Sequence, residues 1–300
     1  MLFRRSLAYL VAFSATATAV FPAPHSSHHG SGGSGPFPAT YLTDPSLPRH
    51  TIYIPESPEL PPWVSLPVLV WAEGGCGNNG TSFEPFLTNI ASYGFIVLAL
   101  GPPNGTGYIF QDAMDDAVTW VQERAGKLGR YENVDSSRIA AAGQSCGGLL
   151  AYTQRHNDAV SFLGIFNSGL LGNTTDAQEN LPKGMIIEEP SVIHEVKKPV
   201  FWWLGGSEDV AQSAGTADYH NLTRVPKWIG NYPVGHSGTY QEPDGGEFGV
   251  AAVNWLRWVL KGDKQASKFF RSGGAERAGW VETESWGLER LDLYSEQDID

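Results

Sequence analysis

Short apolar runs and stretches with helical spacing alternate through most of this chain, and this alternation restricts the possible folds more than any other feature. The order of strand, helix and strand is typical of parallel strands joined by crossover helices. It predicts one doubly wound α/β domain whose ligands bind at the carboxyl ends of the strands. Strands are expected at 67–72, 95–100, 138–143, 162–167, 200–204 and 227–232.

Three of the expected helices have clear sequence signals. Thr81 and Glu84 form a capping-box pattern, which predicts a helix over 82–93 that stops at Gly94. Apolar residues recur at helical spacing from Ala113 to Val121, and again over 248–260.

The run GQSCG at 143–147 lies where an apolar strand ends and a helical stretch begins. A serine on a sharp strand-to-helix turn needs small residues two positions away on either side, because the strained backbone there passes close to its neighbours. Gly143 and Gly147 occupy these two positions. The pentapeptide alone has moderate specificity, but in this context it predicts that Ser145 is a nucleophile.

A serine nucleophile needs a histidine to accept its proton and a carboxylate to orient that histidine. In this layout the acid and then the histidine follow the serine in the sequence, each just after a strand. We therefore expect Asp209 to be the acid and His236 to be the base. Glu208 remains an alternative acid, and the alternative bases are His156, His194 and His220.

The chemistry also requires an oxyanion hole with two backbone N–H donors. One donor belongs to the residue after the nucleophile, which is Cys146, and the other to the loop after an early central strand. That loop is the glycine-rich run EGGCG at 73–77. Without the serine motif, the same run would be read as a tight connecting loop.

With these motifs in place, residues 50–270 resemble secreted esterases of the α/β-hydrolase family. The closest likeness is to the dienelactone-hydrolase-like and PET-hydrolase-like (cutinase-type) branch, and especially to its fungal members. The matching segments are VLVWAEGGCG, ASYGFIVLAL, AAGQSCGG, WLGGSEDVA, GHSGTY and WLRWVLKGD.

The resemblance implies an α/β-hydrolase fold and hydrolysis of carboxylic esters through an acyl-enzyme, with no cofactor and no metal. Counted back from Phe95, the position of the oxyanion donor in these relatives corresponds to Cys76, with Gly75 as the second choice. Near the end, where related fungal proteins carry a cysteine-rich segment, this chain reads SGGAE at 272–276. Contacts of the tail therefore cannot be transferred from the family.

The only two cysteines, Cys76 and Cys146, fall in the two turns that are expected to form the oxyanion hole. If their N–H groups converge on one oxygen, their Cα atoms lie within the roughly 4.4–6.8 Å that a disulfide spans. We therefore expect a Cys76–Cys146 disulfide. The alternative is a pair of buried free thiols whose side chains diverge.

Composition excludes several classes of protein. The chain carries 20 Lys and Arg against 32 Asp and Glu, a net charge of −12, which repels phosphate backbones and anionic lipids. Nucleic-acid binding is therefore not expected. Two cysteines are too few for a zinc ribbon or a disulfide-dense scaffold. We expect a monomer whose partner is its ester substrate.

The N-terminus differs from the rest of the chain. Two arginines, an apolar run over 7–13 and small residues up to Ala19 predict a secretory signal peptide over 1–19. The alternative, a membrane anchor, needs a longer apolar run. Secretion also agrees with N-glycosylation sequons, which are a weak signal because they occur by chance. These sequons lie at Asn79, Asn104, Asn173 and Asn221.

Domain boundaries follow from composition. Residues 20–48 form a lead-in rich in Gly, Ser and His, in which His25, His28 and His29 are either metal ligands or, as we favour, part of a solvated tract. The catalytic domain is expected over 49–270. A polar tail with no clear periodicity is expected over 271–300.

About 30 residues separate the strand ending near Asn167 from the strand starting near Val200, which predicts a small lid or none. An open cleft favours bulky or polymeric esters. Tryptophans 71, 202 and 203 either line the cleft or, as we favour for strand residues, belong to the core. Three alternatives remain: a serine peptidase of the same fold, a dienelactone hydrolase proper, which would favour a cysteine nucleophile, and a non-catalytic secreted binding protein.

Overall fold

The computed structural model describes residues 32–56, 60–61, 63–172, 183, 185 and 188–291. The expected signal peptide, the histidines of the lead-in and the sequon at Asn173 lie outside the described residues.

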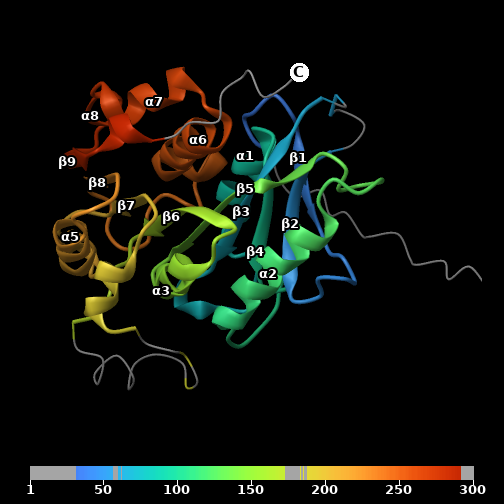
Figure 1. The fold of residues 1–300 in the computed structure, drawn as a ribbon, viewed down its shortest axis with the longest axis horizontal. Helices are drawn as coiled ribbons and strands as arrows, with labels where there is room; N and C mark the ends of the chain where they lie inside the picture. Colours follow the sequence, from blue (N-terminus) through green and yellow to red (C-terminus); the bar gives the residue numbers. More distant parts are fainter. Residues whose placement is uncertain are drawn as a thin grey trace, which may run out of the picture.

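A nine-stranded sheet forms the centre of the molecule, in the order β1-β2-β4-β3-β5-β6-β7-β8-β9 (Figure 1). The six neighbouring strands β4, β3, β5, β6, β7 and β8 are parallel, whereas β1, β2 and β9 pair antiparallel with their neighbours. The expected mostly parallel α/β architecture is thus confirmed. The strands are β1 (Ala39–Leu42), β2 (His50–Pro55), β3 (Leu66–Ala72), β4 (Ile96–Leu100), β5 (Val134–Gln144), β6 (Val160–Phe166), β7 (Val200–Leu204), β8 (Lys227–Asn231) and β9 (Val281–Trp286).

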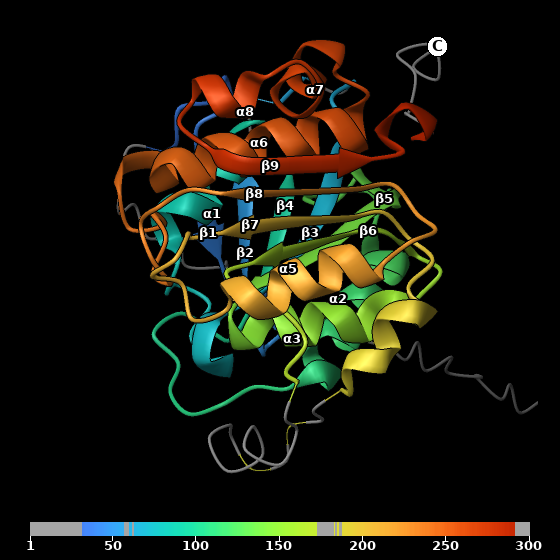
Figure 2. The ribbon, with the colours of Figure 1, turned by 90° about the vertical axis from the view of Figure 1, so that its left-hand side faces the viewer.

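Helices cover both faces of the sheet (Figure 2). One face packs against α1 (Glu84–Ser92), α6 (Gly246–Lys261) and α7 (Lys264–Arg271), and the short α8 (Gly274–Arg277) lies on the same side. The opposite face packs against α2 (Gln111–Arg124), α3 (Cys146–Thr153) and α5 (Gln212–Asn221).

Strands β3, β4 and β7 are apolar at every position because both faces of the sheet are covered. In β3, Val68 and Val70 pack toward α2 and α3, whereas Leu69 and Trp71 pack toward α1 and α6. Trp71, Trp202 and Trp203 are fully buried, which confirms that they belong to the core.

The capping-box prediction is wrong. Helix α1 begins at Glu84, with Phe83 at its N-cap. The hydroxyl of Thr81 instead donates to Asn79 Oδ1, at 2.7 Å, in the turn before the helix. Asparagine side chains commonly stabilise such turns by bonding to the residue two positions on.

The fold extends beyond both expected domain boundaries. At the start, β1 pairs with β2, and the Ser34 backbone N–H donates to Asn89 Oδ1 of α1, so residues from 32 onward belong to the domain. At the end, β9 pairs with β8, and the buried Trp280 donates through Nε1 to Glu247. The expected polar tail is therefore wrong for the described residues up to 291.

Candidate active site

The turn at Ser145 joins β5 to α3 and holds the serine in a strained conformation, with φ +54° and ψ −120°. A Cβ on Gly147 would lie 2.0 Å from the carbonyl oxygen of Ala72, and one on Gly143 would lie 2.4 Å from the Gly147 carbonyl carbon. These contacts explain why both positions are glycine. Backbone strain of this kind concentrates at functional sites.

Neighbouring backbone and side chains fix this turn from the β6 side. The Ser145 N–H donates to the carbonyl of Phe166 at 2.9 Å. The Ser168 hydroxyl donates to the Ser145 carbonyl at 2.7 Å. The serine side chain is thereby held at the carboxyl end of the sheet.

His236 and Asp209 follow neighbouring strands, β8 and β7, and meet Ser145 at this edge. His236 Nε2 lies 2.9 Å from Ser145 Oγ, and His236 Nδ1 lies 2.6 Å from Asp209 Oδ1. An ionised carboxylate only accepts hydrogen bonds, so Nδ1 carries the proton and Nε2 is free to accept from the serine. The structure thus brings together the three residues expected from the sequence.

The carboxylate of Asp209 is fully buried and has several donors. Its Oδ1 accepts from His236 and from the N–H of Ala211, and its Oδ2 accepts from the N–H of Gly205 and from Asn167 Nδ2. Burial alone raises the pKa of Asp209, but these hydrogen bonds outweigh it and hold the pKa below the usual value. Asp209 is therefore a carboxylate at neutral pH.

The alternative acid and bases lie elsewhere. Glu208 is exposed, and the hydrogen bond to His236 comes from its neighbour Asp209. His156, His194 and His220 are also exposed, on η2 (Gln154–His156), η3 (Pro190–Glu195) and α5.

The expected disulfide between Cys76 and Cys146 is present, with the two Cα atoms 5.2 Å apart. Cys76 ends the short helical turn η1 (Gly74–Cys76) after β3, and Cys146 begins α3. Met185 covers the bridge, with its Sδ 3.4 Å from Cys146 Sγ and 3.7 Å from Cys76 Sγ. The disulfide therefore joins the turn of Ser145 directly to the turn at 74–76, where an oxyanion donor is expected.

Gly75 and Cys76 both have positive φ, 64° and 48°. A Cβ on Gly75 would meet no atom within 4 Å, so it is the conformation rather than the space that favours glycine there. Gly75 is exposed, whereas Cys76 is buried.

Glu73, the residue before this turn, has a fully buried carboxyl group. Trp71 Nε1 donates to one of its oxygens at 3.2 Å, and the other has no partner among the described residues. Burial raises the pKa of Glu73 well above its usual value. Burial thus disfavours a negative charge on Glu73, which lies beside the turn where an oxyanion donor is expected.

Sequence reasoning missed three polar residues at the site. Gln144 donates through Nε2 to the carbonyl of His236 at 3.0 Å. Asn167 contacts Asp209, and the Tyr240 hydroxyl donates to Asn167 Oδ1 at 2.5 Å. For Gln144 and Asn167 the available signal was their position at or just after a strand end, which does not distinguish them from ordinary loop residues. Tyr240 lies well beyond the end of β8 and had no such signal.

Three of the sequons lie in the described part of the chain. Asn104 and Asn221 are exposed. Asn79 is partly buried, and its Oδ1 accepts hydrogen bonds from both the N–H and the hydroxyl of Thr81.

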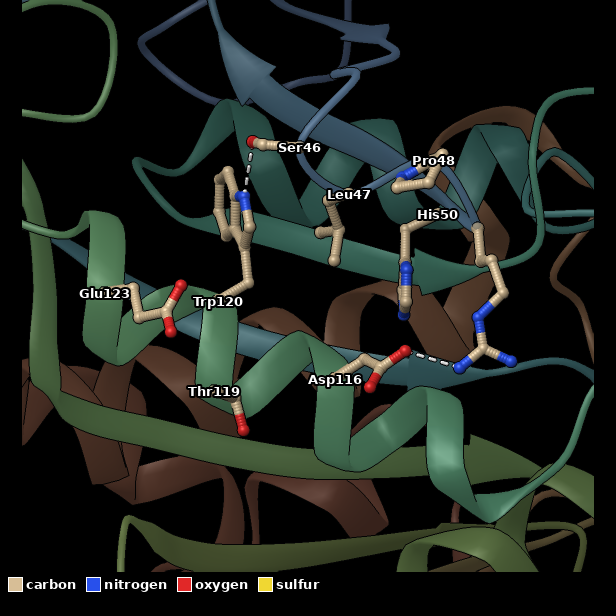
Figure 3. Close-up of a pocket in the computed structure, with 9 residues that line it drawn as sticks. Ser46, Leu47, Pro48, His50, Asp116, Thr119, Trp120 and Glu123 are labelled. Carbon is tan, nitrogen blue, oxygen red and sulfur yellow. Dashed lines mark hydrogen bonds and ion pairs between the residues drawn. The ribbon is translucent and has the colours of Figure 1, made fainter.

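A pocket of about 310 Å³ lies away from the triad, between the segment leading into β2 and helix α2 (Figure 3). Arg49 at its rim pairs with Asp112 and Asp116. His50 is buried in its wall and bonds through Nε2 to the carbonyl of Ala113, and burial lowers its pKa to about 4. None of the nine lining residues belongs to the triad, so this pocket is separate from the candidate active site.

Comparison of the sequence with models of known protein families and with curated proteins found no match. Within the described ranges, no helix is long and apolar enough to cross a membrane. The same residues contain no cluster of His, Cys, Asp and Glu that could hold a metal ion.

Proposed function

We propose that the protein is a secreted serine carboxylic ester hydrolase of the α/β-hydrolase fold, acting through an acyl-enzyme. The observation that carries this proposal is the pair of hydrogen bonds from Ser145 to His236 and from His236 to Asp209, built on a strained strand-to-helix turn. A nucleophile, a base and an orienting acid in this geometry are the requirements for acyl transfer.

In the proposed mechanism, Ser145 Oγ attacks the ester carbonyl carbon while His236 Nε2 accepts its proton. Asp209 stabilises the resulting imidazolium, and the N–H groups of Cys146 and of Cys76, or else Gly75, stabilise the negatively charged oxygen. His236 then donates its proton to the departing alcohol. A water molecule, deprotonated by His236, releases the acid from Ser145 in the second half of the cycle.

Exposed apolar side chains beside the site support an apolar or bulky ester as the substrate. Val210 follows Asp209 and is 82% exposed, and Val234 lies two residues before His236 and is 41% exposed. Tyr108, 64% exposed, pairs with Gly77 next to the disulfide. Single exposed apolar residues are common, but these three adjoin the acid, the base and the oxyanion turn.

The proposal of secretion rests on the sequence of residues 1–19 and on the sequons. The disulfide agrees with it, because such bonds persist mainly in oxidising compartments.

The test is hydrolysis of p-nitrophenyl esters from acetate to palmitate by the purified protein and by Ser145→Ala. We expect wild-type turnover and a loss of several orders of magnitude in the variant, as for other triads. Ser267→Ala is the matched control, because among the described residues that hydroxyl bonds within α7, to the carbonyl of Lys264. Labelling of Ser145 by a fluorophosphonate gives a second readout. A folded wild-type protein that neither hydrolyses an ester nor takes up the label would contradict the proposal.

A further inference from the structure

Asn167 is the least expected residue around the candidate triad. It follows β6, is fully buried and has φ +43°, in the left-handed region that most side chains avoid. Its backbone N–H donates to the carbonyl of Trp203 at 2.7 Å, which fixes it against β7. A strained, buried polar residue at this position calls for an explanation in terms of its side chain.

The amide of Asn167 has different partners at its two ends. Its Nδ2 donates to Asp209 Oδ2 at 2.8 Å and lies 3.4 Å from the carbonyl of Gly235. Its Oδ1 accepts from the Tyr240 hydroxyl at 2.5 Å. Because an ionised Asp209 only accepts, the amide must present Nδ2 to it and Oδ1 to the tyrosine.

Tyr240 is buried, and its hydroxyl reaches the amide of Asn167. Its ring packs against aromatic side chains, which fix its position. Burial, and secondarily the charge of Asp209, raises the pKa of Tyr240 well above its usual value, so the hydroxyl keeps its proton and remains a donor. The packed rings are those of Trp71, Phe83, Phe86, Phe166 and Phe248.

These hydrogen bonds connect the acid and the base through a second route, besides their direct contact. Asp209 bonds His236 through Oδ1 and Asn167 through Oδ2, and Asn167 bonds Tyr240, which follows His236 by four residues on the same segment. A displacement of the acid therefore disturbs contacts on both sides of the histidine. The arrangement holds Asp209 and His236 in register without touching the reacting atoms.

We propose that Asn167 and Tyr240 are positioning residues, which act in series to fix the Asp209 carboxylate against His236. The proposal rests on the function proposed above, in which Asp209 orients the base. It requires that the Tyr240 hydroxyl act only through Asn167, since that amide is the acceptor the structure gives it.

The experiment is a double-mutant cycle with Asn167→Gly, Tyr240→Phe and the combined variant. Glycine suits the positive φ, so it removes the amide without adding backbone strain. Phenylalanine keeps the ring within the aromatic cluster. For an ester hydrolysed by the wild type, we expect kcat to fall roughly 100-fold for Asn167→Gly and roughly 10-fold for Tyr240→Phe, with KM changed less than twofold. The combined variant should match Asn167→Gly alone, because residues acting in series are not additive.

Tyr53→Phe is the matched control. Tyr53 is also fully buried, and its hydroxyl donates to a single carbonyl, that of Gly80. This variant loses a buried hydroxyl and some stability, but should keep the wild-type kcat. Independent losses of kcat that multiply in the combined variant, or an equal loss in Tyr53→Phe, would overturn the proposal.

A second readout does not depend on ester hydrolysis. The proton on His236 Nδ1, donated to Asp209, gives a downfield NMR resonance that is assigned by its loss in His236→Ala. In Asn167→Gly we expect this resonance to move upfield or to exchange rapidly with water, and in Tyr53→Phe to stay unchanged. If the wild type hydrolyses no ester but the resonance responds in this way, the proposed function fails and the positioning role stands. An unchanged resonance in Asn167→Gly overturns the positioning role.

Discussion

The Cys76–Cys146 disulfide provides a stability prediction that can be calculated from the chain itself. The bridge joins residues 70 positions apart. In the chain-entropy account, closing a loop of that length in the unfolded state stabilises the folded protein by about 4 kcal/mol at 25 °C. Replacing both cysteines by alanine also removes the two sulfur atoms that contact Met185, which adds roughly 1–2 kcal/mol for the cavity.

The two contributions sum to about 5–6 kcal/mol, so we expect the Cys76→Ala/Cys146→Ala variant to unfold at a lower urea concentration. At about 2 °C per kcal/mol for a chain of this size, it should lose roughly 10–12 °C in Tm. The free energy of unfolding should also fall more steeply with urea concentration, because the unfolded chain without the bridge exposes more surface. Equilibrium urea unfolding, followed by tryptophan fluorescence, measures both quantities.

Reductant separates the two contributions. Wild type unfolded and refolded in reductant keeps its sulfur atoms but loses the bridge, so it should lose only the part due to loop closure. The alanine variant contains no cysteine and serves as the control, because reductant should leave its unfolding curve unchanged. The reasoning would be refuted if the free energies of unfolding of oxidised and reduced wild type differ by less than about 1 kcal/mol and depend equally steeply on urea concentration.

Two further predictions concern residues around the site. Gly147→Ala places a Cβ 2.0 Å from the backbone oxygen of Ala72, so we expect more than about 3 kcal/mol of destabilisation in urea unfolding, whereas Gly172→Ala, where the Cβ meets nothing within 4 Å, should change stability little. Equal urea unfolding curves for the two variants would contradict this explanation of why position 147 is glycine. Burial raises the pKa of Asp218 to about 7 despite hydrogen bonds from Tyr152 and Leu170. The folded state therefore keeps this proton to a higher pH than the unfolded state, and stability falls as pH rises from about 4 to about 7, by an amount on the order of 4 kcal/mol. The lowered pKa of His50 makes stability change in the opposite direction over an overlapping pH range, so the wild type alone cannot isolate Asp218. The test is to compare the free energy of unfolding of the wild type with that of Asp218→Asn at each pH. If the aspartate is responsible, the difference between these two free energies narrows as pH falls from about 7 to about 4.

The parts of the fold that were predictable are those determined by local sequence. Strands β3, β4 and β7 are apolar at every position, and β5, β6 and β8 each contain a shorter apolar run, so each was recognisable from such a run. The three residues of the candidate triad could be placed because each follows such a strand. In contrast, β9 is exposed at most positions and has no apolar pattern to detect, although pairing with β8 holds it in place.

The contacts that the sequence did not reveal are long-range. Tyr240 meets Asn167 across 73 positions, and the pairing depends on how β6 and the segment after β8 converge. A tyrosine in a loop and an asparagine at the end of a strand are common, and neither suggests the other. Local patterns also compete, as at Thr81, where a turn stabilised by Asn79 replaced the expected helix cap.

Strand β9 has a consequence for how the protein behaves at high concentration. An edge strand with free N–H and C=O groups is a template on which a second molecule can add a strand. In β9 the positive φ of Glu282 and a shift of register against β8 interrupt the regular edge, and Glu282 and Glu284 would set carboxylates on one copy against those on the next. Arg290 lies over the ring of Trp286 and covers part of its apolar surface. This edge therefore opposes sheet-to-sheet aggregation, and removing residues 281–291 would uncover β8 and lose that protection.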